Sequence, residues 1–337
     1  MRPRLSQPVT TLRVLRRCYS SATAEPLIRV TNLPAPNTGH IRILELNRPS
    51  ARNAISKALL ANLRAEIDEL HSQYGPNGEE LPLPQRFGGA AGVDEKGPTR
   101  AVVLASAVDT SFCAGADLKE RKGFTPGEYV YLSSSVNGLA LTVICRTAEF
   151  LTNLRNTFTS LSNLPIPTIS AISSVALGGG LELALSTHFR VLSSNATVGL
   201  PETRLGIIPG AGGTHRLPAL IGLSRARDLI LTGRRVGAPE AYFLGIADRL
   251  VEVVPKDERD GSAILSEARK AALSEAVRLA QEICEGGPIG VRAGLQAVAW
   301  AREEVENKMY ERVVNSEDRN EALKAFGEKR KPIFTGR

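Results

Sequence analysis

The chain has 337 residues, of which 42% are hydrophobic and 23% are charged. This ordinary globular balance excludes a disordered, collagen-like or disulfide-scaffold protein. Lysine and arginine number 42 against 35 acidic residues, which gives a net charge of +7. Five of the arginines lie in the first 24 residues, which contain no acid, so the rest of the chain carries only 7 − 5 = +2. A charge this small does not by itself predict a nucleic-acid partner.

Residues 1–24 resemble a mitochondrial transit peptide, because they are rich in arginine, serine and threonine and lack acids. We expect cleavage near Tyr19 or Ser20. Arg13, Arg16 and Arg17 interrupt the apolar stretch that a secretory signal would need. A merely disordered basic tail is the alternative interpretation. The segment predicts a protein of the mitochondrial matrix.

Beyond this leader, strand-like runs alternate with helical patterns. Residues 41–46 predict a strand, and residues 56–70 predict a helix with Ser56 as its N-cap. The glycines and prolines of residues 75–99 predict a flexible, solvated insertion. The uninterrupted apolar run at residues 101–105 predicts a strand that is buried on both faces.

The alternation continues through the second half of the chain. The predicted elements are a helix at 151–161, a strand at 168–172, a helix at 181–185, a strand at 189–192, a helical stretch at 222–247, a strand at 250–254 and a mostly helical region at 262–327. This pattern predicts an α/β fold with a parallel sheet and crossover helices. We divide the chain into the leader, a core at 25–260 and a C-terminal helical region at 261–337.

Cysteines and histidines give no sign of a metal site. The cysteines stand at 18, 113, 145 and 284, too far apart in sequence for a metal or redox pair. The four histidines show no ligand spacing either. We expect Cys113, Cys145 and Cys284 to be reduced and buried. No membrane span is predicted, because prolines, glycines and Glu182 interrupt the most apolar stretch at 164–185.

Three segments carry candidate chemistry. Residues 111–120 follow a predicted strand, and their small side chains would let a ligand approach the backbone. Residues 176–183 place three glycines before a helix, where free N–H groups can bind a developing negative charge. A tight turn would explain these glycines but not Glu182, an acid in an otherwise apolar helix.

The third segment, residues 198–214, is a glycine-rich loop in which Glu202 follows a proline. The simpler interpretation of this glutamate is an acid that interacts with a helix dipole. The sequence contains no dinucleotide fingerprint after a strand, no Walker loop and no Gly-x-Ser-x-Gly elbow. Nucleotide binding and serine-hydrolase chemistry are therefore not indicated.

Together the three segments resemble the enoyl-CoA hydratase/isomerase (crotonase) family, in family order and spacing. The motifs that carry the resemblance are residues 112–121, 177–185 and 207–214, and they look most like the branch that hydrates 3-methylglutaconyl-CoA. The resemblance covers residues 40–330 apart from the insertion. It implies a crotonase-like spiral of ββα units, with a C-terminal helical region for oligomerisation and active-site cover.

The resemblance also implies a site, residue by residue. The backbone N–H groups of Ala116 and Gly179 would bind the thioester oxygen. Glu182 would act mainly on water and Glu202 mainly on the C2 proton. The residues implied in coenzyme A binding are Ala114, Ala116, Asp117, Leu118, Lys119, Gly178, Gly179, Phe326 and Lys329, the last two acting on a neighbouring subunit. No metal or redox cofactor is implied, and coenzyme A enters as part of the substrate.

The implied reaction adds water across the 2,3-double bond of an enoyl-CoA thioester. The substrate implied most closely is 3-methylglutaconyl-CoA, which becomes 3-hydroxy-3-methylglutaryl-CoA in leucine degradation. The alternative is a short-chain enoyl-CoA hydratase of fatty-acid β-oxidation. A homotrimer or hexamer is implied. An RNA-binding protein on the same scaffold is the alternative of another class, but the mixed charges of residues 48–69 are typical of an ordinary solvated helix.

Overall fold

The structure is a computed structural model that describes residues 25–82, 97–117, 119–120, 146–254 and 261–337. The leader, Leu118, Cys145 and the middle of the insertion lie outside the described residues. Cys113 and Cys284 are free and buried, as predicted. Among the described helices, none is long and apolar enough to cross a membrane.

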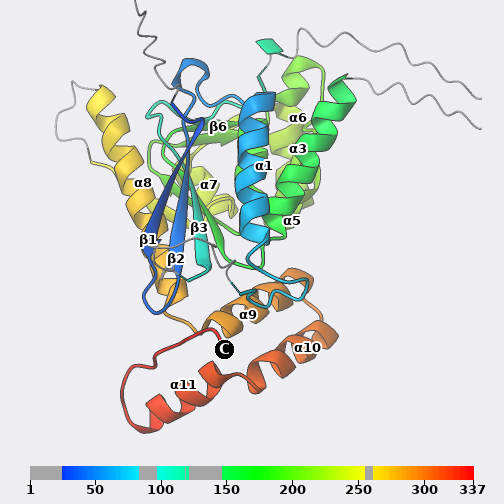
Figure 1. Cartoon of the computed structure of the whole chain (residues 1–337). Helices are drawn as coiled ribbons and strands as arrows, with labels where there is room; N and C mark the ends of the chain where they lie inside the picture. Colours follow the sequence, from blue (N-terminus) through cyan, green and yellow to red (C-terminus); the bar gives the residue numbers. More distant parts are fainter. Residues whose placement is uncertain (1–24, 83–96, 118, 121–145, 255–260) are drawn as a thin grey trace, which may run out of the picture.

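A six-stranded sheet with the order β1-β2-β3-β5-β7-β10 forms the centre of the body (Figure 1). Its strands are β1 Ile28–Pro34, β2 His40–Leu46, β3 Thr99–Ser106, β5 Thr168–Ile172, β7 Phe189–Ser193 and β10 Arg249–Val251. β1 and β2 are antiparallel, and the other pairs are parallel. All of β3 is buried, which confirms the strand predicted to be covered on both faces.

Helices cover both faces of this sheet (Figure 1). On one face Val102 and Leu104 join a core with α1 (Lys57–His71) and α3 (Arg146–Ser162). On the other face Ala101 and Val103 pack with alanines of α8 (Gly261–Cys284). Alternate residues of one apolar run therefore serve two cores, as expected of a parallel strand. The predicted N-cap of α1 is confirmed, since Ser56 Oγ accepts a hydrogen bond from the N–H of Leu59 at 3.2 Å.

A second sheet has four short strands in the order β4-β6-β8-β9. They are β4 Ser111–Cys113, β6 Val175–Leu177, β8 Thr197–Gly199 and β9 Arg235–Gly237. β4, β6 and β8 each follow a strand of the large sheet, so the chain winds as a spiral between the two sheets. None of these four strands was predicted from the sequence, because three residues are too few to show an alternation. The three candidate segments overlap β4, β6 and β8 and continue beyond the carboxyl ends of these strands.

The remaining helices of the body are short. They are α4 Gly179–Ala184, α5 Gly213–Ile221, α6 Leu223–Thr232 and α7 Ala238–Leu244. The single helical stretch predicted for 222–247 is wrong, because β9 separates α6 from α7. Gly233 (φ 59°) adopts the left-handed conformation that ends α6.

The C-terminal region is helical, but its first helix, α8, belongs to the core of the body. The helices that stand apart from the body are α9 Pro288–Trp300, α10 Glu303–Val314 and α11 Glu317–Gly327 (Figure 1). We refer to α9, α10 and α11 as the helical lobe. The helical lobe therefore starts at residue 288, and the helical region predicted at 261–337 contains both the lobe and α8.

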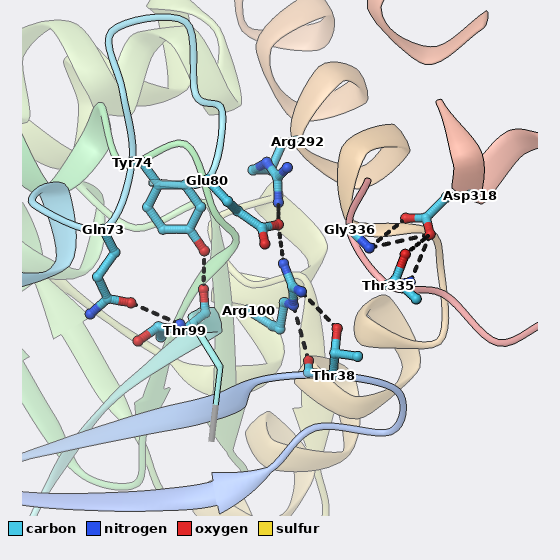
Figure 2. Close-up of polar contacts among 10 residues, drawn as sticks. All are labelled: Thr38, Gln73, Tyr74, Glu80, Thr99, Arg100, Arg292, Asp318, Thr335 and Gly336. Atoms are coloured by element: carbon cyan, nitrogen blue, oxygen red, sulfur yellow. Dashed lines mark hydrogen bonds and ion pairs between the residues drawn. The ribbon is translucent and has the colours of Figure 1, made fainter. Parts of the chain in front are cut away.

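Glu80 ties the helical lobe to the body (Figure 2). Its carboxylate accepts hydrogen bonds from both Arg100 of β3 and Arg292 of α9. Arg100 also donates to the carbonyl and hydroxyl oxygens of Thr38, at 3.0 and 2.7 Å. Gly78 is buried. This end of the insertion is packed between the body and the lobe, which differs from the solvated loop expected for residues 75–99.

Candidate active site

The three candidate segments meet around a cavity of 720 Å³. Because β4, β6 and β8 run parallel, the loops that leave their carboxyl ends lie at one edge of the second sheet. Six of the predicted site residues line the cavity, namely Ala114, Ala116, Gly178, Gly179, Glu182 and Glu202. The structure thus brings together residues that lie up to 88 positions apart in the sequence (202 − 114 = 88).

The first two loops approach each other through their backbones. A Cβ atom at Gly115 (φ 98°) would lie 2.8 Å from the carbonyl oxygen of Leu177 and 3.4 Å from the nitrogen of Gly179. Only glycine fits this approach. Among the described residues, no acceptor takes a hydrogen bond from the N–H of Ala116 or of Gly179. Two neighbouring donors are therefore available to an oxygen that gains negative charge.

Glu182 is buried in α4, with its carboxylate held in one orientation. Its Oε1 accepts hydrogen bonds from the N–H groups of Ala211 and Gly213, at 2.7 and 2.8 Å. Burial raises the pKa of this carboxyl, while the two N–H groups and the charges of Arg216 and Arg155 act in the opposite direction. The loop of the third segment, residues 198–214, thus fixes the carboxylate of Glu182 in the second segment.

Glu202 is buried in a different environment. It begins a 3-10 turn, Glu202–Leu205, and its side chain lies close to the backbone of Gly178. A Cβ atom added at Gly178 would lie only 3.0 Å from Oε1 of Glu202. Its Oε2 is buried and has no hydrogen-bond partner among the described residues. Burial, and then the charge of Glu182, raise its pKa to about 7. Glu202 therefore keeps a proton more readily than an ordinary glutamate does.

The unlike surroundings of the two acids allow a division of roles. Two N–H donors favour an ionised Glu182, whereas a buried oxygen without a donor favours a protonated Glu202. Paired acids whose environments differ in this way can serve as base and acid in one reaction. The cavity can therefore hold one group that accepts a proton and another that donates one.

Two further predicted residues, Asp117 and Lys119, follow Ala116 in the first loop and are not among the residues that line the cavity. The Asp117 carboxylate pairs with Arg48 at 2.8 Å and accepts hydrogen bonds from the N–H groups of Lys119 and Glu120. Its oxygens are thus used within the chain, and the residue orders the turn. The side chain of Lys119 is exposed, and Leu118 lies outside the described residues.

The structure does not bring Phe326 and Lys329 to this cavity. Phe326 lies in the last turn of α11 and is 86% exposed, and Lys329 follows the end of this helix. Their predicted role is contact with a substrate bound to a neighbouring subunit. Because that role concerns a second subunit, it stays a prediction.

Sequence reasoning missed two arginines in the cavity wall, Arg155 of α3 and Arg235 of β9. Leu151, Leu154 and Arg155 have the i, i+3, i+4 spacing of one helix face, and all three line the cavity. The position of Arg155 on the apolar face of the predicted helix was a signal in the sequence that could have revealed it. No comparable signal marks Arg235, because the strand that carries it is only three residues long.

Comparisons with known proteins agree with this arrangement. A model of the enoyl-CoA hydratase/isomerase family matches residues 92–337. The chain is 67% identical to methylglutaconyl-CoA hydratase 1, mitochondrial, of Pyricularia oryzae, over 95% of this chain and 90% of that protein. It is 53% identical to an enoyl-CoA isomerase/hydratase of Zymoseptoria tritici, over 95% and 91% of the two chains.

Among solved structures, an enoyl-CoA hydratase of Bacillus anthracis superimposes with a TM-score of 0.70. The two sequences are 34% identical, over 93% of this chain and all of that one. The predicted crotonase fold and hydratase class are therefore confirmed. The chain belongs to the enoyl-CoA hydratase/isomerase family.

Proposed function

We propose that this enzyme hydrates 3-methylglutaconyl-CoA to 3-hydroxy-3-methylglutaryl-CoA. The observation that carries the proposal is the cavity in which two unlike carboxyl groups, Glu182 and Glu202, lie beside the free N–H groups of Ala116 and Gly179. The relative from Pyricularia oryzae, named a methylglutaconyl-CoA hydratase, supports the choice of acyl group.

The residues would act as follows. The thioester oxygen accepts hydrogen bonds from the N–H groups of Ala116 and Gly179, and these strengthen as the oxygen becomes an enolate. Glu182 takes a proton from water, whose oxygen bonds to C3. Glu202 gives its proton to C2. Before the next turnover, the proton that Glu182 took from water must pass to Glu202. The two carboxyl groups are close enough for the charge of Glu182 to act on Glu202.

This mechanism predicts a loss of activity on the alkaline side. Glu202 must begin each turnover protonated, and burial raises its pKa to about 7. Above that pH, kcat/KM should fall by about tenfold per pH unit, because the acid form becomes scarce. A series of initial rates from pH 5.5 to 9.5 measures the profile, with circular dichroism as the control for folding. A rate that rises from pH 7 to pH 9 would contradict the role of Glu202 as the acid.

The substrate is tested with the purified chain lacking residues 1–19. The measurement is kcat/KM for 3-methylglutaconyl-CoA and for crotonyl-CoA. We expect a strong preference for the former. A preference for crotonyl-CoA would replace the proposed substrate with a short-chain fatty enoyl-CoA and leave the roles of Glu182 and Glu202 in place.

We further propose a setting for the enzyme. It would work in the mitochondrial matrix, as the name of the Pyricularia oryzae relative and the arginine-rich leader suggest. It would form a trimer or hexamer through surfaces that include the helical lobe. The exposed Phe326 supports a contact there. It would use no metal or redox cofactor, because proton transfers and hydrogen bonds suffice for the reaction.

A further inference from the structure

The proposed substrate brings a charge problem into the cavity. 3-Methylglutaconyl-CoA carries a carboxylate two bonds beyond C3, the carbon that receives water. That carboxylate must lie near Glu182, the ionised acid that activates the water at C3, and like charges at short range repel. A cation is needed close to the water-activating end of the cavity.

Arg155 fits this requirement by position. It lies on the cavity side of α3, and its Nε donates a hydrogen bond to the carbonyl oxygen of Gly210 at 2.6 Å. Gly210 precedes Ala211, whose N–H binds Glu182. The guanidinium is thus anchored to the loop that holds Glu182, and its positive charge reaches that carboxyl.

The binding edge of Arg155 is also available. Within the described part of the chain, no carboxylate forms an ion pair with this arginine. Its one hydrogen bond there uses Nε and leaves the two terminal nitrogens for a ligand. These nitrogens form the planar fork that binds a carboxylate through two parallel hydrogen bonds.

Arg235 is the competing cation in the same wall. It belongs to β9, opposite Gly199 of β8, on the side of the cavity that leads to Glu202. Only Arg155, of these two arginines, has a charge that acts on Glu182. Because the distal carboxylate lies so close to C3, the arginine beside Glu182 is the better placed.

We propose that Arg155 binds the distal carboxylate of the substrate and thereby makes the enzyme selective for enoyl-CoA thioesters with an acidic acyl chain. This inference rests on the proposed hydratase function and adds its specificity-determining residue. Arg155 orients the substrate and offsets the repulsion from the ionised Glu182, and it takes no part in the proton transfers.

The first test compares Arg155→Met with Arg235→Met as the matched control. The readout is the ratio of kcat/KM for 3-methylglutaconyl-CoA to kcat/KM for crotonyl-CoA. We expect the ratio to fall about tenfold or more in Arg155→Met, the scale for losing hydrogen bonds between two charged groups. Arg235→Met should change it by less than about threefold, because Arg235 is exposed and lies on the side of the cavity that leads to Glu202 rather than beside Glu182. Arg155→Lys should show a smaller fall in the ratio, since lysine keeps the positive charge but lacks the two parallel donors of the guanidinium.

The ratio separates recognition from positioning. Arg155 also supports the loop at Gly210, so its removal can slow both substrates by disturbing Glu182. A loss shared equally by both substrates leaves the ratio unchanged and would overturn the proposal. A large fall in Arg235→Met instead of Arg155→Met would overturn it as well.

A second readout uses ligands that do not react. Calorimetry with glutaryl-CoA and butyryl-CoA measures the contribution of the distal carboxylate to the Kd. We expect the unsubstituted enzyme to prefer glutaryl-CoA and Arg155→Met to lose that preference. If the enzyme fails to hydrate 3-methylglutaconyl-CoA yet shows this Arg155-dependent preference, the proposed substrate is wrong and the assignment of Arg155 stands. No preference in the unsubstituted enzyme would overturn the assignment.

Discussion

Replacing Glu182 or Glu202 by glutamine should lower kcat for hydration by about 10³-fold, the scale of general acid–base catalysis by one positioned group. Glutamine at 182 can still accept the two N–H groups through its amide oxygen, so the loop at Ala211 and Gly213 should keep its place. It cannot take a proton from water. Glutamine at 202 cannot deliver a proton to C2. The measurement is the steady-state rate per enzyme at saturating substrate.

The matched control is Glu285→Gln, which makes the same chemical change at an exposed site after α8. It should retain the unsubstituted rate. The double variant Glu182→Gln/Glu202→Gln should be little slower than either single variant, because residues that act as a unit in one step are not additive. Full activity in both single variants would refute the mechanism. A loss in only one of them would identify a single acid–base group and remove the division of roles.

The sequence predicted the large sheet well where long apolar runs form it. The strand predicted at 168–172 is β5, Thr168–Ile172, and the run at 101–105 lies within β3. Long runs are informative because a strand covered on both faces needs apolar residues at every position. The strands β4, β6, β8 and β9 are three residues each and carry no periodic signal, although three of them position the cavity.

The candidate site was predictable only in part. The resemblance named Ala116, Gly179, Glu182 and Glu202, and the structure brings them to one cavity. Spacing along the chain could not reveal that Glu182 is held by two N–H groups, whereas an oxygen of Glu202 has no donor among the described residues. These differences depend on contacts between segments far apart in sequence, and they give the two acids unlike electrostatic surroundings.

The Glu80 cluster is another feature that only the folded chain reveals. Glu80, in a stretch rich in glycine and proline, lies between Arg100 and Arg292, whose side chains are 5% and 4% exposed (Figure 2). Arg292 also stacks over the ring of Tyr74, with 5.5 Å between the guanidinium carbon and the ring centroid. One carboxylate thus offsets two buried cations at the junction between the body and the helical lobe.

Replacing Glu80 by glutamine should therefore lower the free energy of unfolding by about 3–5 kcal/mol, because both arginines stay buried without their counter-charge. Urea unfolding measures the loss. Limited proteolysis between α8 and α9 should show the lobe released before the body unfolds, since Glu80 joins the two parts.

Glu79→Gln, at the exposed neighbouring position, is the matched control and should change stability by less than about 0.5 kcal/mol. Adding Arg292→Met to Glu80→Gln should recover part of the loss, because it removes one of the two uncompensated charges. If Glu80→Gln matches the control in stability and in proteolysis, the ion pairs do not hold the lobe. Apolar contacts between α9 and the body would then have to supply the attachment.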